Sequence, residues 1–340
     1  MPDGPILEVR NLRKDYALDK RSPFGGAARS LHAVKDVSFA LHAGQTIGLV
    51  GESGCGKSTL ARSVLRLDEP TGGEVLYHGR NILDLPREDM RRLRRRIQVV
   101  FQDPYGSLDP RFTVRRIIQE PWEVFPDIVP RDRREARVTE LLQLVGLHPT
   151  DADRHPHQFS GGQRQRIGIA RALALEPEVI ICDEPVSALD VSVQAQVINL
   201  LMNLQKELGI AYLFIAHDLS VVHHISDRVM VMYLGEVIEE GPVEEIFFAP
   251  KHPYTVALLS AVPVPDPKMR DRDVIVLDGE VPNPVTPPAG CAFHPRCRHA
   301  TELCRATPPP PQPVPGGHAR CHYVGKHDFD KHVGHLAADQ

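Results

Sequence analysis

Runs of apolar residues divide the first 260 residues of the chain into strands and helices. Residues 5–12 and 35–41 alternate between apolar and polar positions, which predicts strands with one buried face, the first with the pattern of an edge strand. Three short continuous apolar runs have the pattern of strands buried on both faces: residues 46–50, 178–183 and 211–216. Helical stretches at 59–67, 163–175 and 191–207 alternate with these runs. Strands and helices that alternate in this way predict an α/β fold with a mainly parallel sheet.

Two regions depart from this alternation. Residues from about 86 to 165 are charged and helix-forming, with breaks at Pro121 and Pro126, and we interpret them as a helical subdomain. From Pro263 onward the regular periodicity disappears and many of the chain's 31 prolines are found, which predicts a separate, irregular module. We therefore expect three parts: a first domain at 1–260, a Pro/Cys-rich extension at 261–325 and a flexible tail at 326–340.

Composition narrows the class of protein. Apolar residues make up 42% of the chain, enough for an ordinary core, yet no apolar run approaches the roughly 18 residues that a membrane span needs. The N-terminal residues show no secretory signal, so we expect a cytosolic chain. A net charge of −4 argues against a large nucleic-acid surface. The basic run at 91–96 is interpreted as a solvated helix face.

The segment from Gly51 to Thr59 has the pattern of a phosphate-binding loop. Its sequence, Gly-Glu-Ser-Gly-Cys-Gly-Lys-Ser-Thr, follows the apolar run 46–50 and precedes a predicted helix. Glycines let backbone N–H groups wrap phosphates, a lysine reaches the outer phosphates and a serine hydroxyl meets Mg²⁺. This loop predicts a nucleotide site held by nine consecutive residues: Gly51, Glu52, Ser53, Gly54, Cys55, Gly56, Lys57, Ser58 and Thr59.

Two further segments extend the predicted nucleotide site. The apolar run 178–183 ends in Asp183, which can hold the metal, and Glu184 follows, where a carboxylate can polarise an attacking water. Upstream lies the segment Ser160, Gly161, Gly162 and Gln163. Ser160 is a good helix N-cap, Gln163 completes a capping box, and the two glycines leave first-turn amides bare for an anion. This segment, hereafter the signature, predicts a second phosphate grip.

These segments together resemble the motif set of ABC transporter ATPases, over residues 1 to about 260. The resemblance rests on an aromatic at Tyr16, the phosphate loop, Gln102, the signature, the Asp183–Glu184 pair, Asp190 and His217, in the family order. It implies ATP and Mg²⁺ as cofactors, and a P-loop NTPase core that carries an antiparallel β subdomain and a helical subdomain.

The resemblance also assigns roles to single residues. Tyr16 would stack on adenine, and Ser58, Gln102 and Asp183 would hold Mg²⁺. Glu184, Gln102, His217 and Lys57 form the expected catalytic set, with His217 at the γ-phosphate. Asp190 and the signature, Ser160, Gly161, Gly162 and Gln163, would complete the nucleotide site, the signature acting on the ATP of an opposite subunit.

Four cysteines lie within 31 residues of the extension: Cys291, Cys297, Cys304 and Cys321. Disulfides are disfavoured in a chain without an export signal, so a metal site is the better interpretation. The spacing C-x5-C-x6-C-x16-C lacks the paired C-x2-C knuckles of zinc fingers. On ligand count alone, an iron–sulfur cluster and zinc suit four thiolates equally well.

The extension and the segment 102–110 resemble ATP-binding subunits of dipeptide and oligopeptide importers, some of which hold a [4Fe-4S] cluster in this extension. The resemblance implies an ATPase at the cytoplasmic face of the membrane, with two transmembrane permease subunits, a second ABC ATPase subunit that is identical or related, and indirectly an extracellular peptide-binding protein. Two alternatives stay open at this point. One is an importer of nickel, glutathione or another small solute, and the other is a soluble ABC-type regulatory ATPase.

Overall fold

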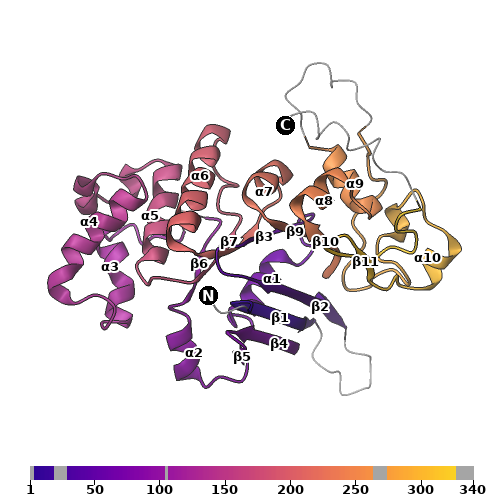
Figure 1. The fold of residues 1–340 in the computed structure, drawn as a ribbon, viewed down its shortest axis with the longest axis horizontal. Coiled ribbons are helices and arrows are strands. Elements are labelled where there is room, and N and C mark those ends of the chain that lie inside the picture. Colours follow the sequence, from indigo (N-terminus) through magenta and orange to yellow (C-terminus); the bar gives the residue numbers. More distant parts are fainter. Residues whose placement is uncertain (1–3, 19–28, 104–105, 263–273, 327–340) are drawn as a thin grey trace.

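The computed structural model describes residues 4–18, 29–103, 106–262 and 274–326, and its backbone forms two sheets with helices around them (Figure 1). The predicted tail at 326–340 lies outside these residues except for its first position. The predicted α/β class is confirmed. The larger sheet has eight strands in the order β11-β12-β10-β9-β3-β8-β7-β6, and the smaller has four in the order β2-β1-β4-β5.

Five neighbouring strands of the larger sheet run parallel and form its centre. They are β6 (Ile97–Val100), β7 (Val179–Asp183), β8 (Ala211–Ile215), β3 (Thr46–Val50) and β9 (Arg228–Tyr233). Side chains of β7 alternate between two core clusters, since Ile180 belongs to one and Ile181 to the other. The sheet is therefore buried on both faces, as continuous apolar runs predict.

The smaller sheet is antiparallel and packs against helix α1 (Lys57–Val64) through a shared apolar cluster. Its strands are β1 (Leu7–Ala17), β2 (Ser30–Leu41), β4 (Gly72–Tyr77) and β5 (Arg80–Asn81). The edge position predicted for residues 5–12 is wrong, because β1 pairs with β2 on one side and β4 on the other. Alternation reports one buried face of a strand and carries no information about its place in the sheet.

The predicted helical subdomain at about 86–165 contains one strand. Residues 97–100 form β6 at the end of the parallel sheet, and α2 (Arg87–Leu93) precedes it. The helices that pack together at the far end of the molecule are α3 (Val114–Val124), α4 (Arg134–Leu144) and α5 (Gly161–Leu173) (Figure 1). Four residues are too short a run for periodicity to separate a strand from a charged helical stretch.

Three more helices follow the core strands, namely α6 (Val191–Leu208), α7 (Leu219–Ile225) and α8 (Val243–Phe248), and α9 (Pro253–Ser260) ends the first domain. Strand β10 (Glu236–Pro242) returns antiparallel to β9. A capping interaction begins α9, since the His252 Nδ1 accepts the Tyr254 N–H at 3.1 Å. Helix α9 stands beside the extension, at the opposite end of the molecule from α4 (Figure 1).

The described part of the extension is more regular than its composition predicts. It contains a short 3₁₀ turn at His294–Arg296, helix α10 (Glu302–Ala306) and the hairpin β11 (Gln312–Val314) and β12 (Gly317–Ala319). Strand β12 pairs with β10, so the extension adds two strands to the main sheet. Pro313 is tolerated because β11 is the last strand of the sheet, where a missing N–H costs no ladder bond.

Candidate nucleotide site

The phosphate loop connects the carboxyl end of β3 to the start of α1. Gly56 has φ +113°, and a Cβ there would lie 2.3 Å from the carbonyl oxygen of Ala33 on β2. Gly51 has φ +151°, and a Cβ there would lie 2.2 Å from the carbonyl oxygen of Met232 on β9. Only glycine fits this conformation and this closeness. The loop is thus held between two strands with its amides at a helix N-terminus, a place that favours anions.

Lys57 begins α1 and is almost fully buried. Its Nζ donates hydrogen bonds to the carbonyl oxygens of Gly51 at 2.7 Å and Glu52 at 3.1 Å. The ammonium group is therefore held inside the curve of the loop by the backbone that it follows. A buried cation at this position supplies charge where phosphates would bind.

Ser58 and Asp183 meet across the ends of α1 and β7. The Ser58 hydroxyl donates to the Asp183 carboxylate at 3.0 Å. Burial raises the pKa of Asp183, with Glu184 adding to the rise, while the bond from Ser58 lowers it. Two oxygen donors that the sequence predicts as Mg²⁺ ligands are thus brought together, and hard cations prefer such oxygens.

Glu184 lies at the centre of a second polar group. Its φ of +50° is uncommon for a residue with a side chain and turns the chain sharply after β7. The Gln102 amide donates to its carboxylate at 2.9 Å, and the His217 Nδ1 lies 3.5 Å from the same oxygen. The structure therefore gathers three residues of the predicted catalytic set at the carboxyl ends of neighbouring strands, where ligand sites of α/β sheets occur.

A cavity of about 350 Å³ lies over the phosphate loop. Ten of the predicted site residues line it: Tyr16, Ser53, Gly54, Cys55, Gly56, Lys57, Ser58, Thr59, Gln102 and Glu184. The Tyr16 hydroxyl donates to Asp68 at 2.9 Å, which orients its ring at the cavity. Cys55 is buried, and burial raises the pKa of its thiol. The sequence did not indicate the other lining residues: Leu31, His32, Ala33, Gly235 and Pro284.

The signature does not line this cavity. Its capping box is present, since Ser160 accepts the Gln163 N–H at 3.3 Å and the Gln163 side chain accepts the Ser160 N–H at 3.0 Å. A Cβ on Gly162 would lie 2.2 Å from Val193 in the first turn of α6. Asp190 is the exposed N-cap of that helix. Within the described residues, the signature and the phosphate loop of one chain therefore form two separate surfaces.

The four extension cysteines line one small cavity of about 20 Å³, together with four histidines: His252, His294, His299 and His322. Burial raises the pKa of Cys291 to about 12 and that of Cys297 to about 11, and the neighbouring thiols add to both shifts. Across the described ranges, no group of three or more His, Cys, Asp or Glu side chains is arranged to hold a metal ion. The sequence thus predicted which cysteines come together, and their ligand remains a prediction.

One ion pair joins the extension to the phosphate loop, and sequence analysis missed it. Arg296 donates two hydrogen bonds to the Glu52 carboxylate, at 2.8 and 3.1 Å. The partners are 244 positions apart in the chain, so no spacing pattern connects them. Glu52 also donates its backbone N–H to the Tyr254 hydroxyl at 3.0 Å.

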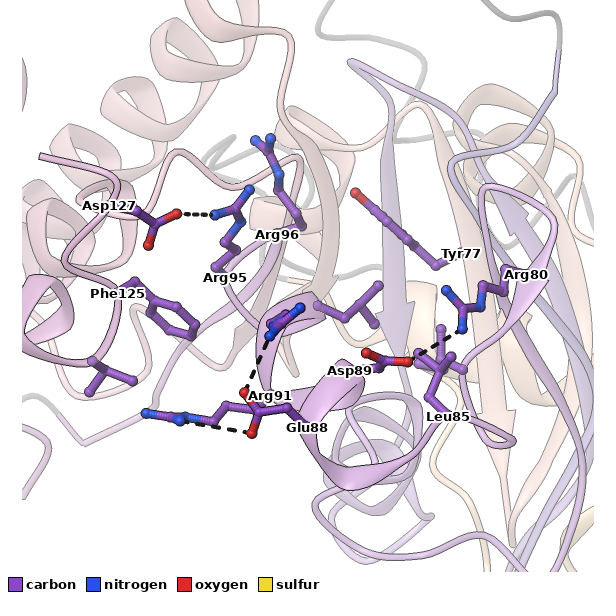
Figure 2. Close-up of a pocket in the computed structure, with 14 residues that line it drawn as sticks. Tyr77, Arg80, Leu85, Glu88, Asp89, Arg91, Arg95, Arg96, Phe125 and Asp127 are labelled. Atoms are coloured by element: carbon purple, nitrogen blue, oxygen red, sulfur yellow. Dashed lines mark hydrogen bonds and ion pairs between the residues drawn. The ribbon is translucent and has the colours of Figure 1, made fainter.

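A further cavity of about 650 Å³ lies elsewhere, between α2, the smaller sheet and the end of α3 (Figure 2). Guanidinium groups surround it, and most face carboxylates: Arg80 with Asp89, Arg91 and Arg92 with Glu88, and Arg95 with Asp127. Only the start of the basic run 91–96 is an exposed helix face, because α2 ends at Leu93. Arg94 follows the helix and donates to the carbonyl oxygen of Arg66 at 2.9 Å. Arg91 and Arg92 share the one carboxylate of Glu88, so five arginines face three carboxylates in the lining of this groove and leave it a net positive charge.

Two family models match the chain. The ABC transporter model matches residues 34–187, and the model of the oligopeptide/dipeptide transporter C-terminal region matches residues 238–304. A probable peptide ABC transporter ATP-binding protein of Sinorhizobium fredii is 55% identical over 318 residues, which cover 93% of this chain and 89% of the relative. The chain belongs to the ABC transporter ATP-binding proteins. It is therefore an ABC ATPase, for which ATP and Mg²⁺ are the expected cofactors.

Other relatives of this ABC ATPase agree. An oligopeptide transport ATP-binding protein of Haemophilus influenzae is 51% identical, with 90% of this chain and 92% of the relative covered. A dipeptide transport ATP-binding protein of Escherichia coli is 51% identical, with 90% of each covered. Among solved structures, a dimeric ATP-binding cassette in a post-hydrolysis state, bound to ADP and Pi, is 30% identical with a TM-score of 0.61, and the match covers 70% of this chain and 98% of that one.

Proposed function

We propose that this ABC ATPase binds and hydrolyses ATP to power the import of dipeptides or oligopeptides through partner permeases. The observation that carries the proposal is the pair of family matches on one chain, the nucleotide-binding part at 34–187 and the peptide-transporter C-terminal region at 238–304. Relatives named for oligopeptide and dipeptide transport match over about nine-tenths of the chain. Importers of nickel or glutathione and a soluble regulatory ATPase are not favoured by these matches.

The geometry supports the following division of work. Lys57, held in the curve of the loop, neutralises the outer phosphates. Ser58 and Asp183 provide oxygen ligands for Mg²⁺, together with Gln102. Glu184, at the position where Gln102 and His217 converge, orients and deprotonates the attacking water.

The separation of the signature from the phosphate loop supports a site completed by a second subunit. Ser160, Gly161, Gly162 and Gln163 present capped helical amides away from the cavity of their own chain. In a head-to-tail pair they would meet the γ-phosphate bound to the opposite phosphate loop, and Asp190 would lie at the same junction. ATP would then close the pair, and hydrolysis would reopen it. The pair is either two copies of this chain or this chain with a related ATPase.

The proposed location is the cytoplasmic face of the cell membrane. Over the residues described, no helix is both long and apolar enough to cross a bilayer. Two transmembrane permease subunits would therefore provide the path, and an extracellular peptide-binding protein would act on the complex through them. Nucleic acid is not a proposed partner.

We further propose that Cys291, Cys297, Cys304 and Cys321 hold a [4Fe-4S] cluster, with zinc as the alternative. The support is the donor chemistry, since all four thiols line one small cavity and neighbouring thiols add to the raised pKa of Cys291 and of Cys297. A bound metal would remove the proton from each thiol and relieve that effect. Anaerobic purification with visible absorption and metal analysis tests this point, and a colourless protein free of iron would refute the cluster.

The decisive experiment on function is ATP hydrolysis by the complex copurified with this chain from its own membranes, with and without a peptide-loaded binding protein. Stimulation by peptide is the expected result. Copurified membrane subunits without stimulation by peptide would leave a transporter of another solute. Recovery of no membrane subunit would overturn the importer assignment.

A further inference from the structure

The contact between the extension and the phosphate loop is a bidentate one. Both terminal nitrogens of Arg296 face the two carboxylate oxygens of Glu52, at 2.8 and 3.1 Å. The Arg296 side chain is only 8% exposed and that of Glu52 24%. A bidentate ion pair fixes the relative orientation of the guanidinium and carboxylate groups, and removal from water strengthens their attraction.

Glu52 contacts three other residues through its backbone and its side chain. Its carbonyl oxygen accepts from Lys57, and its N–H donates to Tyr254 at the start of α9. The side chain of the same residue is then held by Arg296. Backbone donor, backbone acceptor and carboxylate are all engaged, so a change at any one partner moves the loop that carries the phosphate-binding amides.

Packing of the neighbouring Phe293 fixes the position of Arg296. The residue ends the 3₁₀ turn that follows Phe293, and Phe293 is buried at 2% exposure. Its ring packs edge-on against Tyr233 of β9 and Tyr254 of α9, with ring centres 5.4 Å apart in both cases. Aromatic contacts of this geometry add to the energy of burial. The position of the guanidinium group is therefore set by the core of the first domain.

The charge of Glu52 gives the contact a consequence for nucleotide binding. A carboxylate in a phosphate-binding loop repels the triphosphate that the loop is built to attract. Arg296 cancels that charge and keeps the carboxylate turned toward the extension. Pro284, also from the extension, lines the nucleotide cavity, so the extension both forms part of its wall and balances its charge.

We propose that Arg296 is a positioning residue of the nucleotide site: it acts through Glu52 to hold the phosphate loop, in the same chain, in the conformation and charge state that bind ATP. The proposal rests on the proposed function, which supplies ATP as the ligand. It makes the affinity for ATP dependent on the C-terminal extension.

The test uses the full chain in its assembled complex and compares Arg296→Gln, Glu52→Gln and the double variant. Arg296→Gln leaves the negative charge of Glu52 unpaired within the phosphate loop, so we expect KM for ATP to rise about tenfold while kcat stays within about twofold. Arg296→Lys keeps the positive charge but cannot form the bidentate contact, so its KM for ATP should lie between those of the parent and Arg296→Gln. Arg305→Gln is the matched control, because Arg305 is an exposed arginine of the same extension whose partner is Glu302.

The double variant separates positioning from folding. Without the carboxylate there is nothing for Arg296 to neutralise, so adding Arg296→Gln to Glu52→Gln should change KM by less than about twofold. If Arg296 only stabilises the extension, Arg296→Gln raises KM for ATP by the same factor in the Glu52→Gln background as in the parent. That result would overturn the proposal. It is also overturned if Arg296→Gln behaves like Arg305→Gln.

Lys57→Ala distinguishes this inference from the proposed function. If Lys57→Ala keeps full affinity for a fluorescent ATP analogue, the phosphate-loop assignment itself fails. If Lys57→Ala loses affinity while Arg296→Gln retains it, the nucleotide site stands and only the role of Arg296 is refuted.

Discussion

The phosphate loop follows β3 in the middle of the larger sheet, the cysteine cavity lies in the extension, and the two sites are built in opposite ways. The loop consists of consecutive residues, and its shape comes from backbone conformations that only glycine allows, as at Gly56 with φ +113°. The cysteine cavity is assembled from side chains of separate turns, fixed by Phe293 and by the pairing of β12 with β10. Backbone conformation therefore sets the shape of the first site, whereas packing between separate segments sets the shape of the second.

A change at Glu184 tests the chemistry of the loop site without touching its backbone. Glu184→Gln keeps the shape and the contact to Gln102 but removes the base, so hydrolysis should fall about a thousandfold. ATP binding should remain within about twofold, and closed ATP-filled dimers should accumulate. Steady-state hydrolysis and size-exclusion chromatography with ATP measure both. Undiminished turnover would remove Glu184 from its role.

A change at Phe293 tests the dependence of the extension on packing. Phe293→Ala removes a fully buried ring from between Tyr233 and Tyr254, and should lower the free energy of unfolding by about 3–5 kcal/mol. Chemical denaturation measures the loss, and hydrogen exchange should place it in residues 274–326. Leu303→Ala, at a 48% exposed position, is the control and should cost less than about 0.5 kcal/mol. Equal losses of unfolding free energy in Phe293→Ala and Leu303→Ala would contradict the packing role of Phe293.

A change at Lys57 tests the claim that the loop site is local. Lys57→Ala removes the charge within the loop, so ATP affinity should fall about a hundredfold, the value of a strong charge-assisted contact. Lys57 does not line the cysteine cavity, so we expect the thiol reactivity of the extension to stay unchanged. Equilibrium binding of a fluorescent ATP analogue and thiol titration check the two halves of the prediction.

The smallest expected effect is a pH dependence that belongs to the packing between β10 and α9. Burial raises the pKa of Glu239 to about 7, against the opposing donors of Lys251 and His252. The native state therefore binds more protons than the unfolded state between the ordinary carboxyl value and 7, and stability contributed by Glu239 is lost as pH rises through this range.

Glu239→Gln isolates this contribution. The variant loses one hydrogen-bond acceptor, which should lower its free energy of unfolding by about 1–2 kcal/mol. Its stability relative to the parent should nevertheless increase from pH 5 to pH 7. Burial lowers the pKa of His252 to about 3, which makes stability rise with pH over the acidic range, and this effect is common to both proteins. Urea denaturation at several pH values gives the difference in free energy of unfolding between the variant and the parent. If this difference is constant with pH, the raised pKa of Glu239 is refuted.

The larger part of the fold was predictable, because the patterns behind it are local. Continuous apolar runs identified β3, β7 and β8, and Ser160 with Gln163 identified the cap of α5. Position within a sheet was not predictable, as β1 shows, because alternation is the same in central and edge strands that bury one face. The hairpin at 312–319 was missed because prolines and glycines hide three-residue strands that are stabilised only by pairing with β10.

The sequence by itself determined the phosphate loop, the Asp183–Glu184 strand end and the signature, since each is a run of residues whose chemistry follows from their order. Only the tertiary structure decided that Glu52 faces Arg296, that Pro284 reaches the nucleotide cavity, and that the signature lies apart from the loop of its own chain. The physical reason is the range of the interactions. Backbone conformation and helix capping act over a few residues, whereas an ion pair between residues 244 positions apart exists only once the sheet has brought both ends of the chain together.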